Sequence, residues 1–372
     1  MKENCIYLDY NATTPVLSEV AEEFRLYAVE YFANPSSAHT FGRFVRQRLE
    51  EFRKKVANFI GAEPEEVIFT SGGTESNHIA ILGTVLKHEK GRILISAFEH
   101  PAVAKPVERL RDLGFEVELI PVSPEGYVDP EDVKRRIKKD TILVSVMFVN
   151  NEIGTIQPIK EIAEVCREKG VIFHTDACQA CGKIQVDVKE LNCDLLSLAG
   201  HKMYAPKGIG ALYIRKEISI LPIFLGGGQE RGLRAGTEPV PLIASLAKAC
   251  EILSSQLIAE ADRLVYLREK LFSGLKEVFP GIYRYGIPEK TVPNTLTVSF
   301  RGINASKMLS ELPQICASTG SACHDRKGSV TLSALGVDPE TAQGTVRFSI
   351  GKLTTEEDVT KAIELIKEYF KR

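Results

Sequence analysis

The chain has 372 residues, of which 44% are hydrophobic and 26% charged, and this is enough apolar material to bury the cores of two domains. Its formal net charge of −2 excludes a strongly basic surface for nucleic acid or anionic membranes. The start, MKENCIYLDYNATTP, lacks the pattern of a signal peptide, and no later run of about eighteen apolar residues is long enough for a membrane span, so we expect a cytoplasmic protein with small-molecule or protein partners.

From about residue 66, short β-branched segments alternate with segments of helical length. The candidate strands are EVIFT, RILIS, EVELIPV, TILVSVMFV, VIFHTDA, LLSLAGHK and GALYIR. Amphipathic stretches at 75–88, 101–113 and 159–169 separate several of them, which is typical of right-handed crossovers that cover a parallel sheet. We therefore predict an α/β fold with a seven-stranded, mostly parallel sheet and helices on both faces.

The second part of the chain has a different pattern. A glycine-rich loop, GGGQERGLRAGTEPVP, is followed by a long helical stretch from about 242 to 279. Beyond it, TLTVSF, ICAST and TVRFSI are candidate strands, and 304–312 and 355–371 are candidate helices. We expect the domain boundary to lie within the long helix, so that 16–255 form the large domain, while 1–15 and 256–372 form a smaller α+β domain.

Unusual residues follow the predicted strands, where open α/β sheets bind ligands. EVIFT leads into Gly73 and Thr74 at the start of a helix, whose free amides and dipole suit a phosphate group. VIFHTDA leads to Asp176 and Gln179, which could bind a cationic ring nitrogen and a phenolate-type oxygen. LLSLAG leads to Lys202, which could form a Schiff base with a carbonyl cofactor. Each feature has an ordinary structural explanation, but together they are the three attachments that pyridoxal phosphate requires.

A larger set of motifs makes this interpretation specific. The sequence resembles the cysteine desulfurases, the NifS and IscS group of fold-type I pyridoxal phosphate enzymes. The matching stretches, in the family's order, are LDYNATTP, NPSSAH, FTSGGTESN, EHPAV, VNNEIGTIQPI, HTDACQACGK, GHKMYAPKGIGALYIR, GGGQERGLRAGTEPV, STGSACH and TVRFSIGKLTTEED. The resemblance implies a transferase that removes sulfur from L-cysteine, releases L-alanine and supplies sulfur for iron-sulfur cluster assembly or other sulfur transfer.

The resemblance also implies a role for each site residue. Lys202 would bind pyridoxal 5'-phosphate covalently and then remove the Cα proton, Asp176 would keep the ring nitrogen protonated, and His100 would stack on the ring and shuttle protons. The remaining contacts are implied to be Gly73, Thr74 and His201 at the phosphate, Thr237 at the phosphate of the other subunit, Gln179 at the phenolic oxygen, and Asn151 with Arg347 at the substrate carboxylate. A homodimer is implied because Thr237 would complete the site of its partner.

The run STGSACHDRKGS places Cys323 among small and charged residues. The resemblance implies that this thiol takes the sulfur as a persulfide, carries it on a mobile loop and passes it to an acceptor protein such as an iron-sulfur scaffold. His324 and Arg326 follow the cysteine closely, and no catalytic role is assigned to His324.

Several other residues allow more than one interpretation. Ala199 stands where the family often has a phosphate-binding serine. Cys178 and Cys181 form a CxxC pair that could be redox-active or bind metal, although small packing residues are the simpler reading. We expect Cys316 to be buried in ICAST, and we expect hydrogen-bonded structural roles for a group of histidines, namely His39, His78 and His174.

Three alternative functions remain open at this point. Selenocysteine lyase shares the fold and nearly all of these residues. An aminotransferase of the same fold would not need Cys323. A scaffold or metal-binding protein that has kept the fold without the cofactor would not need Lys202, Asp176 or His100.

Overall fold

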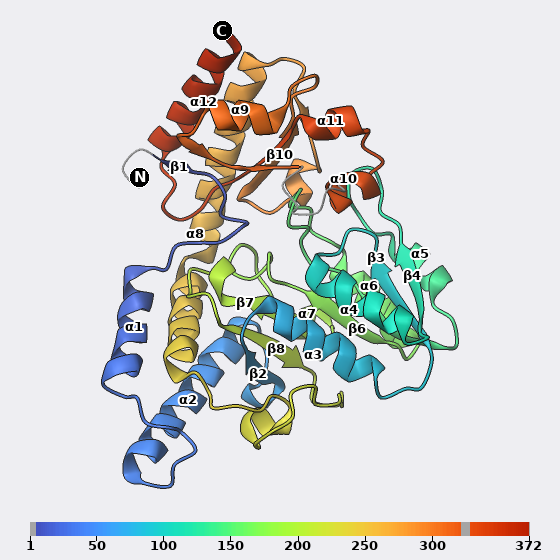
Figure 1. The fold of residues 1–372 in the computed structure, drawn as a ribbon, viewed down its shortest axis with the longest axis vertical. Helices are drawn as coiled ribbons and strands as arrows, with labels where there is room; N and C mark the ends of the chain where they lie inside the picture. The colour runs from blue at the N-terminus through green and yellow to red at the C-terminus, as the bar shows by residue number, and fades with distance from the viewer. Residues whose placement is uncertain (1–4, 321–327, 372) are drawn as a thin grey trace.

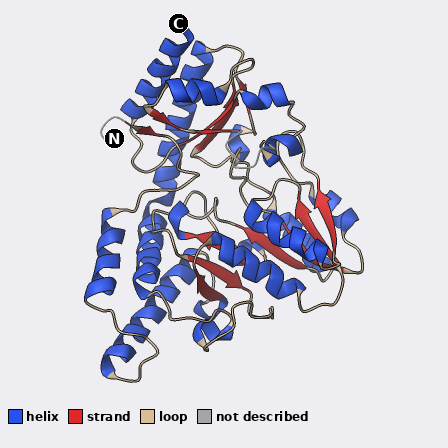
Figure 2. Ribbon diagram, in the orientation of Figure 1, coloured by secondary structure: helices blue, strands red, loops and turns tan. Residues whose placement is uncertain are grey.

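A seven-stranded sheet lies at the centre of the larger part of the computed structural model, which describes residues 5–320 and 328–371 (Figures 1 and 2). Its strand order is β2–β8–β7–β6–β5–β3–β4. The strands are β2 (Val67–Thr70), β3 (Arg92–Ser96), β4 (Glu116–Ile120), β5 (Thr141–Ser145), β6 (Ile172–Asp176), β7 (Leu195–Ala199) and β8 (Gly210–Ile214). The predicted α/β class and the seven strands are confirmed.

The direction of each strand determines which ends meet. Strands β4, β3, β5, β6 and β7 pair in parallel. Strand β8 is antiparallel to both of its neighbours, β7 and β2. Strand β2 therefore runs in the same direction as β7, and the carboxyl ends of six strands lie along one edge of the sheet.

Helices cover both faces because consecutive strand residues point to opposite sides. On β3, Ile93 and Ile95 pack in one core with residues of α3 (Gly73–Val85) and α4 (Pro101–Asp112). Leu94, between them, lies in a different core that includes residues of α6 (Ile159–Glu168) and α8 (Val240–Val278). The strands can be apolar throughout, as LLSLA is, because each face has its own helical layer.

Two helices precede the region where the sequence analysis began. These are α1 (Ser18–Val29) and α2 (Thr40–Phe59), and both pack on α8 at the lower left of Figure 1. Helix α2 places Val45, Leu49, Phe52 and Val56 in the core, at the spacing of one helical face. This periodicity was readable from the sequence. Two shorter helices, α5 (Pro130–Arg136) and α7 (Val188–Leu191), were also not predicted.

The outer edge of β2 is covered by side chains of the glycine-rich loop rather than by another strand. The Glu230 carboxylate accepts a hydrogen bond of 2.8 Å from the Phe69 amide, and Arg231 donates to the Val67 carbonyl at 2.7 Å. Arg53 from α2 donates to Glu230 through both terminal nitrogens, at 2.7 and 2.8 Å. The loop is thereby fastened to the end of the sheet.

The smaller part of the molecule lies at the top of Figure 1, where both chain ends are found. Its sheet has the order β12–β13–β10–β9 and is antiparallel. Its elements are β9 (Tyr283–Arg284), β10 (Thr295–Ser299), α9 (Ala305–Glu311), β11 (Ile315–Cys316), β12 (Ser318–Thr319), α10 (Val330–Ala334), α11 (Pro339–Gln343), β13 (Thr345–Ser349) and α12 (Glu356–Lys371). Strand β1 (Ile6–Tyr7) also belongs to this part of the molecule, where it pairs in parallel with β11 in a separate two-stranded sheet.

Helix α8 connects the two parts. Its first half, with Leu246 and Leu253, lies in the core of the large sheet, and its second half, with Leu264 and Leu271, lies in the core of the smaller part. These separate cores support the proposed division into 16–255 and 1–15 with 256–372, which stays a prediction.

The sequence expectation that no segment is apolar enough to span a membrane needs a correction at α8. By length and composition alone this helix qualifies, with a window of mean hydropathy 1.4 that is 44% buried inside the protein. The cores that α8 shares with the sheet and with α12 account for this apolar composition.

Candidate active site

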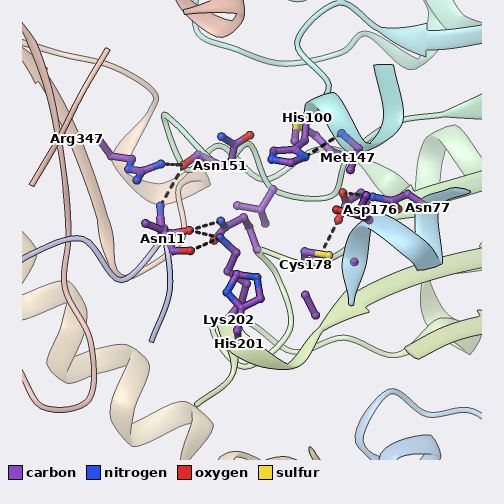
Figure 3. Close-up of a pocket in the computed structure, with 17 residues that line it drawn as sticks. Asn11, Asn77, His100, Met147, Asn151, Asp176, Cys178, His201, Lys202 and Arg347 are labelled. Atoms are coloured by element: carbon purple, nitrogen blue, oxygen red, sulfur yellow. Dashed lines mark hydrogen bonds between the residues drawn. The ribbon is translucent and has the colours of Figure 1, made fainter. Parts of the chain in front are cut away.

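A cavity of about 430 Å³ opens at the carboxyl edge of the large sheet (Figure 3). Its lining includes nine of the residues singled out in the sequence, namely Gly73, Thr74, His100, Asn151, Asp176, Gln179, His201, Lys202 and Arg347. Thr237 does not line it and is exposed. Cys323 lies outside the described residues. The structure therefore places most of the predicted residues at one site.

The topology explains this convergence. Thr74 follows β2, His100 follows β3, Asn151 follows β5, Asp176 ends β6 and Lys202 follows β7. These strands run in the same direction, so residues far apart in the chain meet where the strands end. The N-terminal segment and β13 close the opposite side, with Asn11 and Arg347 (Figure 3).

The start of α3 has the features of a phosphate site. Within the described part of the chain, no side chain caps this helix at Gly72. The first backbone amides of the helix therefore have no intrahelical acceptor, and Gly73 and Thr74, which carry two of them, line the cavity. A Cβ atom on Gly73 would lie 2.4 Å from the Cys178 sulfur and 3.3 Å from the Ala199 Cβ. Only glycine therefore fits, and the turn can approach an anion closely.

Asp176 presents a buried carboxylate to the cavity, with 6% of the residue exposed. Its two oxygens accept hydrogen bonds from the Asn77 side-chain amide at 2.7 Å and the Cys178 backbone amide at 2.9 Å. The Asn77 Oδ1 atom is buried and has no hydrogen-bond partner among the described residues. A polar group bound beside Asp176 would therefore find both a negative charge and a free acceptor.

Lys202 places its amine at the wall of the cavity. Its Nζ donates to the Ala12 carbonyl at 2.8 Å and also to the Asn11 carbonyl. Burial lowers the pKa of Lys202 to about 8, with the nearby Arg347 charge acting in the same direction. An appreciable share of the amine is consequently neutral near neutral pH, as attack on a carbonyl requires.

Two histidines also line the cavity. His201, whose Nδ1 lies 3.2 Å from the Thr13 hydroxyl, has its pKa lowered to about 4 by burial and by the Lys202 charge. His100 caps α4, because its Nδ1 accepts a hydrogen bond of 3.1 Å from the Ala102 amide. Its ring is exposed to the open cavity, yet desolvation by the surrounding protein lowers its pKa.

Arg347 is held on the opposite wall. Its NH2 group donates to Asp9 at 2.7 Å and to Ser318 at 3.0 Å, and its NH1 group donates to the Asn151 carbonyl at 2.9 Å. Its Nε atom is buried without a partner among the described residues. The guanidinium is thus fixed in orientation while one N–H remains available to an anion.

Two residues of the site were missed in the sequence. The Asn11 carbonyl accepts hydrogen bonds from Lys202 and from the Gln179 amide at 2.9 Å, and its side-chain oxygen accepts from Lys183 at 3.1 Å. Lys183 also donates to the Gln179 side-chain oxygen, and burial lowers its pKa well below the usual value. Both residues lie in motifs quoted above, and the spacing of four between Gln179 and Lys183 was the available signal.

The CxxC pair and the remaining histidines form other contacts. Cys178 lines the cavity and Cys181 is buried, and burial raises the pKa of both thiols, to about 12 for Cys181. Each histidine is hydrogen-bonded: His39 caps α2, His78 contacts the Thr74 carbonyl at 2.8 Å, and His174 bonds Ser145 and Ser197 on the two neighbouring strands.

Comparison with known proteins places the chain in a family. The model of the Aminotransferase class-V family matches residues 6–361. The chain belongs to this family, whose enzymes use pyridoxal 5'-phosphate.

Its relatives are more specific. The chain is 44% identical to "Cysteine desulfurase IscS" of Dictyoglomus turgidum, with 99% of this chain and 95% of the relative covered. It is also 44% identical to the protein of the same name from Methanosarcina thermophila, with 99% and 92% covered. The resemblance to cysteine desulfurases drawn from the motifs is confirmed.

Solved structures agree with this assignment. A "NIFS-LIKE PROTEIN" superposes with a TM-score of 0.92 at 38% identity, covering 98% of this chain and 99% of that chain. "SspA in complex with cysteine" superposes with a TM-score of 0.83 at 35% identity, covering 92% and 98%. The fold-type I architecture is therefore shared along nearly the whole chain.

The residues present fit the cofactor of this family. The uncapped turn at Gly73 suits its phosphate, the Asp176 carboxylate suits its ring nitrogen, and Lys202 supplies an amine for its aldehyde. These three groups lie at or just beyond the ends of β2, β6 and β7, and all of them line one cavity.

Proposed function

We propose that this protein is a cysteine desulfurase that uses pyridoxal 5'-phosphate to convert L-cysteine to L-alanine and to transfer the sulfur to an acceptor. The observation that carries the proposal is the half-buried Lys202 amine, with its lowered pKa, in a cavity that also contains Asp176 and Arg347. The chain is 44% identical, over 99% of its length, to proteins named cysteine desulfurase, and this similarity supports the choice of substrate.

The wall formed by the large sheet would hold the cofactor. When bound, pyridoxal phosphate supplies an electron-withdrawing ring that stabilises negative charge at the substrate Cα. Asp176 would keep a proton on the ring nitrogen, and its hydrogen bonds from Asn77 and Cys178 fix it for this contact. The other assigned contacts are the Gly73 amide, Thr74 and His201 at the phosphate, and Gln179 at the phenolic oxygen.

The opposite wall would bind the amino acid. Asn151 and Arg347 would take the carboxylate of L-cysteine, and the unpartnered Nε of Arg347 supports this role. Lys202, once its amine is released, would accept the Cα proton. His100 would stack on the ring and move protons through the ring nitrogen that does not cap α4.

The sulfur is proposed to go to Cys323. Gly320 is the last described residue before Cys323 and precedes it by three positions. It lines a smaller cavity together with Asn151 and Arg347, so the chain lies beside the proposed carboxylate-binding residues at this point. A persulfide on Cys323 would then be passed to an acceptor protein, such as an iron-sulfur scaffold.

A homodimer completes the proposal. Thr237 is exposed and lies outside the cavity of its own subunit, which is compatible with a contact to the phosphate in the partner. A cytoplasmic location stays a prediction of the sequence.

The experiment is incubation of the purified holoenzyme with L-cysteine, followed by alanine analysis, intact mass and peptide mapping. We expect alanine, together with a gain of about 32 Da that maps to Cys323. Lys202→Ala should lose both, whereas Lys216→Ala, which changes an exposed lysine, should lose neither. Sulfur on Cys178 instead would contradict the assignment of Cys323, and absence of alanine would contradict the function. Parallel rates with selenocysteine distinguish a selenocysteine lyase.

A further inference from the structure

Two thiols lie together outside the cavity, where the N-terminal segment meets the smaller part of the molecule. The sulfur atoms of Cys5 and Cys316 are 3.3 Å apart, although 311 positions separate the residues. Both cysteines are free, Cys5 is exposed and Cys316 is half-buried. The sequence expectation that Cys316 is buried is therefore wrong, because it lies on the outer face of its strand.

The strand register explains why the thiols meet. In the parallel pair β1–β11, Ile6 is opposite Ile315 and Tyr7 is opposite Cys316, and the Ile6 amide donates to the Gln314 carbonyl at 2.7 Å. Ile6 and Ile315 pack in the core of the smaller part. Because side chains alternate along a strand, Cys5 and Cys316 are both directed to the opposite side. The contact thus follows from a register that burial of the isoleucines fixes.

The two thiols differ in exposure and therefore in their chemical roles. Burial, with contributions from Cys5 and Asp9, raises the pKa of Cys316 to about 11. Cys316 consequently stays protonated near neutral pH, and its sulfur lies within hydrogen-bond distance of the Cys5 sulfur. Cys5 is the sulfur that a dissolved reagent reaches first.

The other described cysteines are much less accessible. Cys166, Cys181, Cys193 and Cys250 are buried, and Cys178 lies in the cavity. Burial raises the pKa of each of these thiols.

We propose that Cys5 and Cys316 are a site of reversible disulfide formation that ties the N-terminal segment to strand β11. The oxidant is a small-molecule disulfide. The Cys5 thiolate attacks one of its sulfurs, its S–S bond breaks, and one small thiolate leaves and takes a proton from water. Cys316 then loses its proton to water and attacks the Cys5 sulfur, so that the second small thiolate leaves and takes a proton from water. Two protein thiols are oxidised and one small disulfide is reduced to two thiols.

The bond would act on stability through the chain that it closes. It would link residue 5 to residue 316 and so enclose most of the sequence, which restricts the unfolded chain strongly. Neither thiol lines the cavity that holds the proposed catalytic residues. The oxidised protein should therefore melt at a higher temperature than the reduced protein. Catalytic turnover should not require the disulfide.

The test uses the full-length holoenzyme, reduced or treated with glutathione disulfide. Non-reducing peptide mapping should show the peptides of Cys5 and Cys316 joined, with a loss of about 2 Da from the intact mass. The melting temperature should rise by about 5 °C. The bond should also form in Cys323→Ser, which removes the thiol assigned to sulfur transfer, and in Cys166→Ala, which removes a buried one.

Single variants provide the decisive comparison. In Cys5→Ser and Cys316→Ser the link and the rise in melting temperature should both disappear, while alanine formation stays within about twofold of the wild type. The proposal is overturned if the oxidised wild type carries only glutathione adducts, if Cys5 is joined to a different cysteine, or if Cys5→Ser shows the same rise in melting temperature. None of these outcomes depends on whether the protein is a desulfurase.

Discussion

Glu99 illustrates how burial acts on a single ionisable group beside the cavity. Its side chain accepts hydrogen bonds from the Ser96 hydroxyl and from the Met147 amide at 2.7 Å, and its second oxygen has no partner among the described residues. Burial raises the pKa of this carboxyl from 4.5 to about 8. Glu99 is thus protonated at neutral pH in the folded protein.

This protonation predicts a pH-dependent effect of Glu99→Gln. Between pH 4.5 and about 8 the unfolded chain releases this proton and the folded chain keeps it, so the wild type loses stability as pH rises. The slope is about 1.4 kcal/mol per pH unit. Glutamine carries no such proton, and its carbonyl can accept the same two hydrogen bonds. Melting temperatures measured from pH 5 to pH 8 should fall for the wild type relative to the variant. If the melting temperatures of the two proteins changed in parallel with pH, Glu99 would be ionised in the folded wild type.

Lys183 is the second residue whose role can be tested alone. It donates hydrogen bonds to the side-chain oxygens of Asn11 and Gln179. The backbone carbonyl of Asn11 in turn accepts hydrogen bonds from Gln179 and from the Lys202 amine. Lys183 is the donor in both of its hydrogen bonds, so the Gln179 side-chain oxygen faces Lys183 and the Gln179 nitrogen donates to the Asn11 carbonyl.

Lys183→Met should therefore weaken binding of pyridoxal phosphate by about tenfold, since two buried hydrogen bonds are lost. An absorbance titration of the apo-protein with the cofactor measures the dissociation constant. The matched control is Lys189→Met, which changes an exposed lysine paired with Glu63 and should leave the constant unchanged. Equal affinity for the cofactor in both variants would show that Lys183 does not contribute to cofactor binding.

At the scale of single elements, the glycine-rich loop depends on one buried ion pair. Arg53 and Glu230 have side chains that are only 5% and 3% exposed. Glu230 and Arg231 adopt left-handed backbone angles, with φ of 46° and 58°, which cost energy in residues other than glycine. The contacts of both side chains with β2 and α2 compensate for this conformation.

Arg53→Met should accordingly destabilise the protein by about 3–5 kcal/mol, because Glu230 would remain as an uncompensated buried charge. The double variant Arg53→Met/Glu230→Gln should recover part of the loss. Arg48→Met is the control, since its pair with Glu51 is more than 40% exposed on both sides and should contribute less than about 1 kcal/mol. Denaturant melts compare these four proteins and the Glu230→Gln single variant, and full additivity of the two single changes in the double variant would contradict the pairing.

The elements differ in how far sequence alone could predict them. Most of strands β2 to β8 were readable because they are short apolar runs bounded by polar residues, while β4 alternates glutamate with apolar residues. The Arg347 contact with Asp9 could not be foreseen, because 338 positions separate the two residues and only the folded N-terminal segment brings them together. Most of the proposed site residues could be selected from the sequence because they follow strands, whereas Asn11 lies in the N-terminal segment and Lys183 lies beyond Gln179, so neither carries that signal.

At the scale of the whole molecule, the proposed dimer predicts complementation between inactive chains. If Thr237 serves the partner's cofactor, a mixed dimer of Thr237→Ala and Lys202→Ala contains one intact site. Random association of equal amounts should then restore about one quarter of the wild-type activity at limiting cofactor.

The two variants are refolded or coexpressed together, and activity is compared with that of each variant alone. A mixture of Lys202→Ala with Lys202→Ala/Thr237→Ala serves as the control, because neither chain then supplies the amine. Activity no higher than the mean of the separate variants would place Thr237 in the site of its own subunit.

The covered edge of β2 also affects the tendency of the protein to aggregate in concentrated solution. An exposed strand edge invites hydrogen bonding from a neighbouring molecule, and such contacts seed aggregates. Here the Phe69 amide and the Val67 carbonyl are already satisfied by Glu230 and Arg231. At the opposite edge, β4 carries the charged side chains of Glu116 and Glu118, which pair with Arg92 and disfavour the docking of an apolar strand. Concentrated solutions of the folded protein should consequently resist edge-to-edge fibre growth, with protection at one margin supplied by hydrogen bonds and at the other by charge.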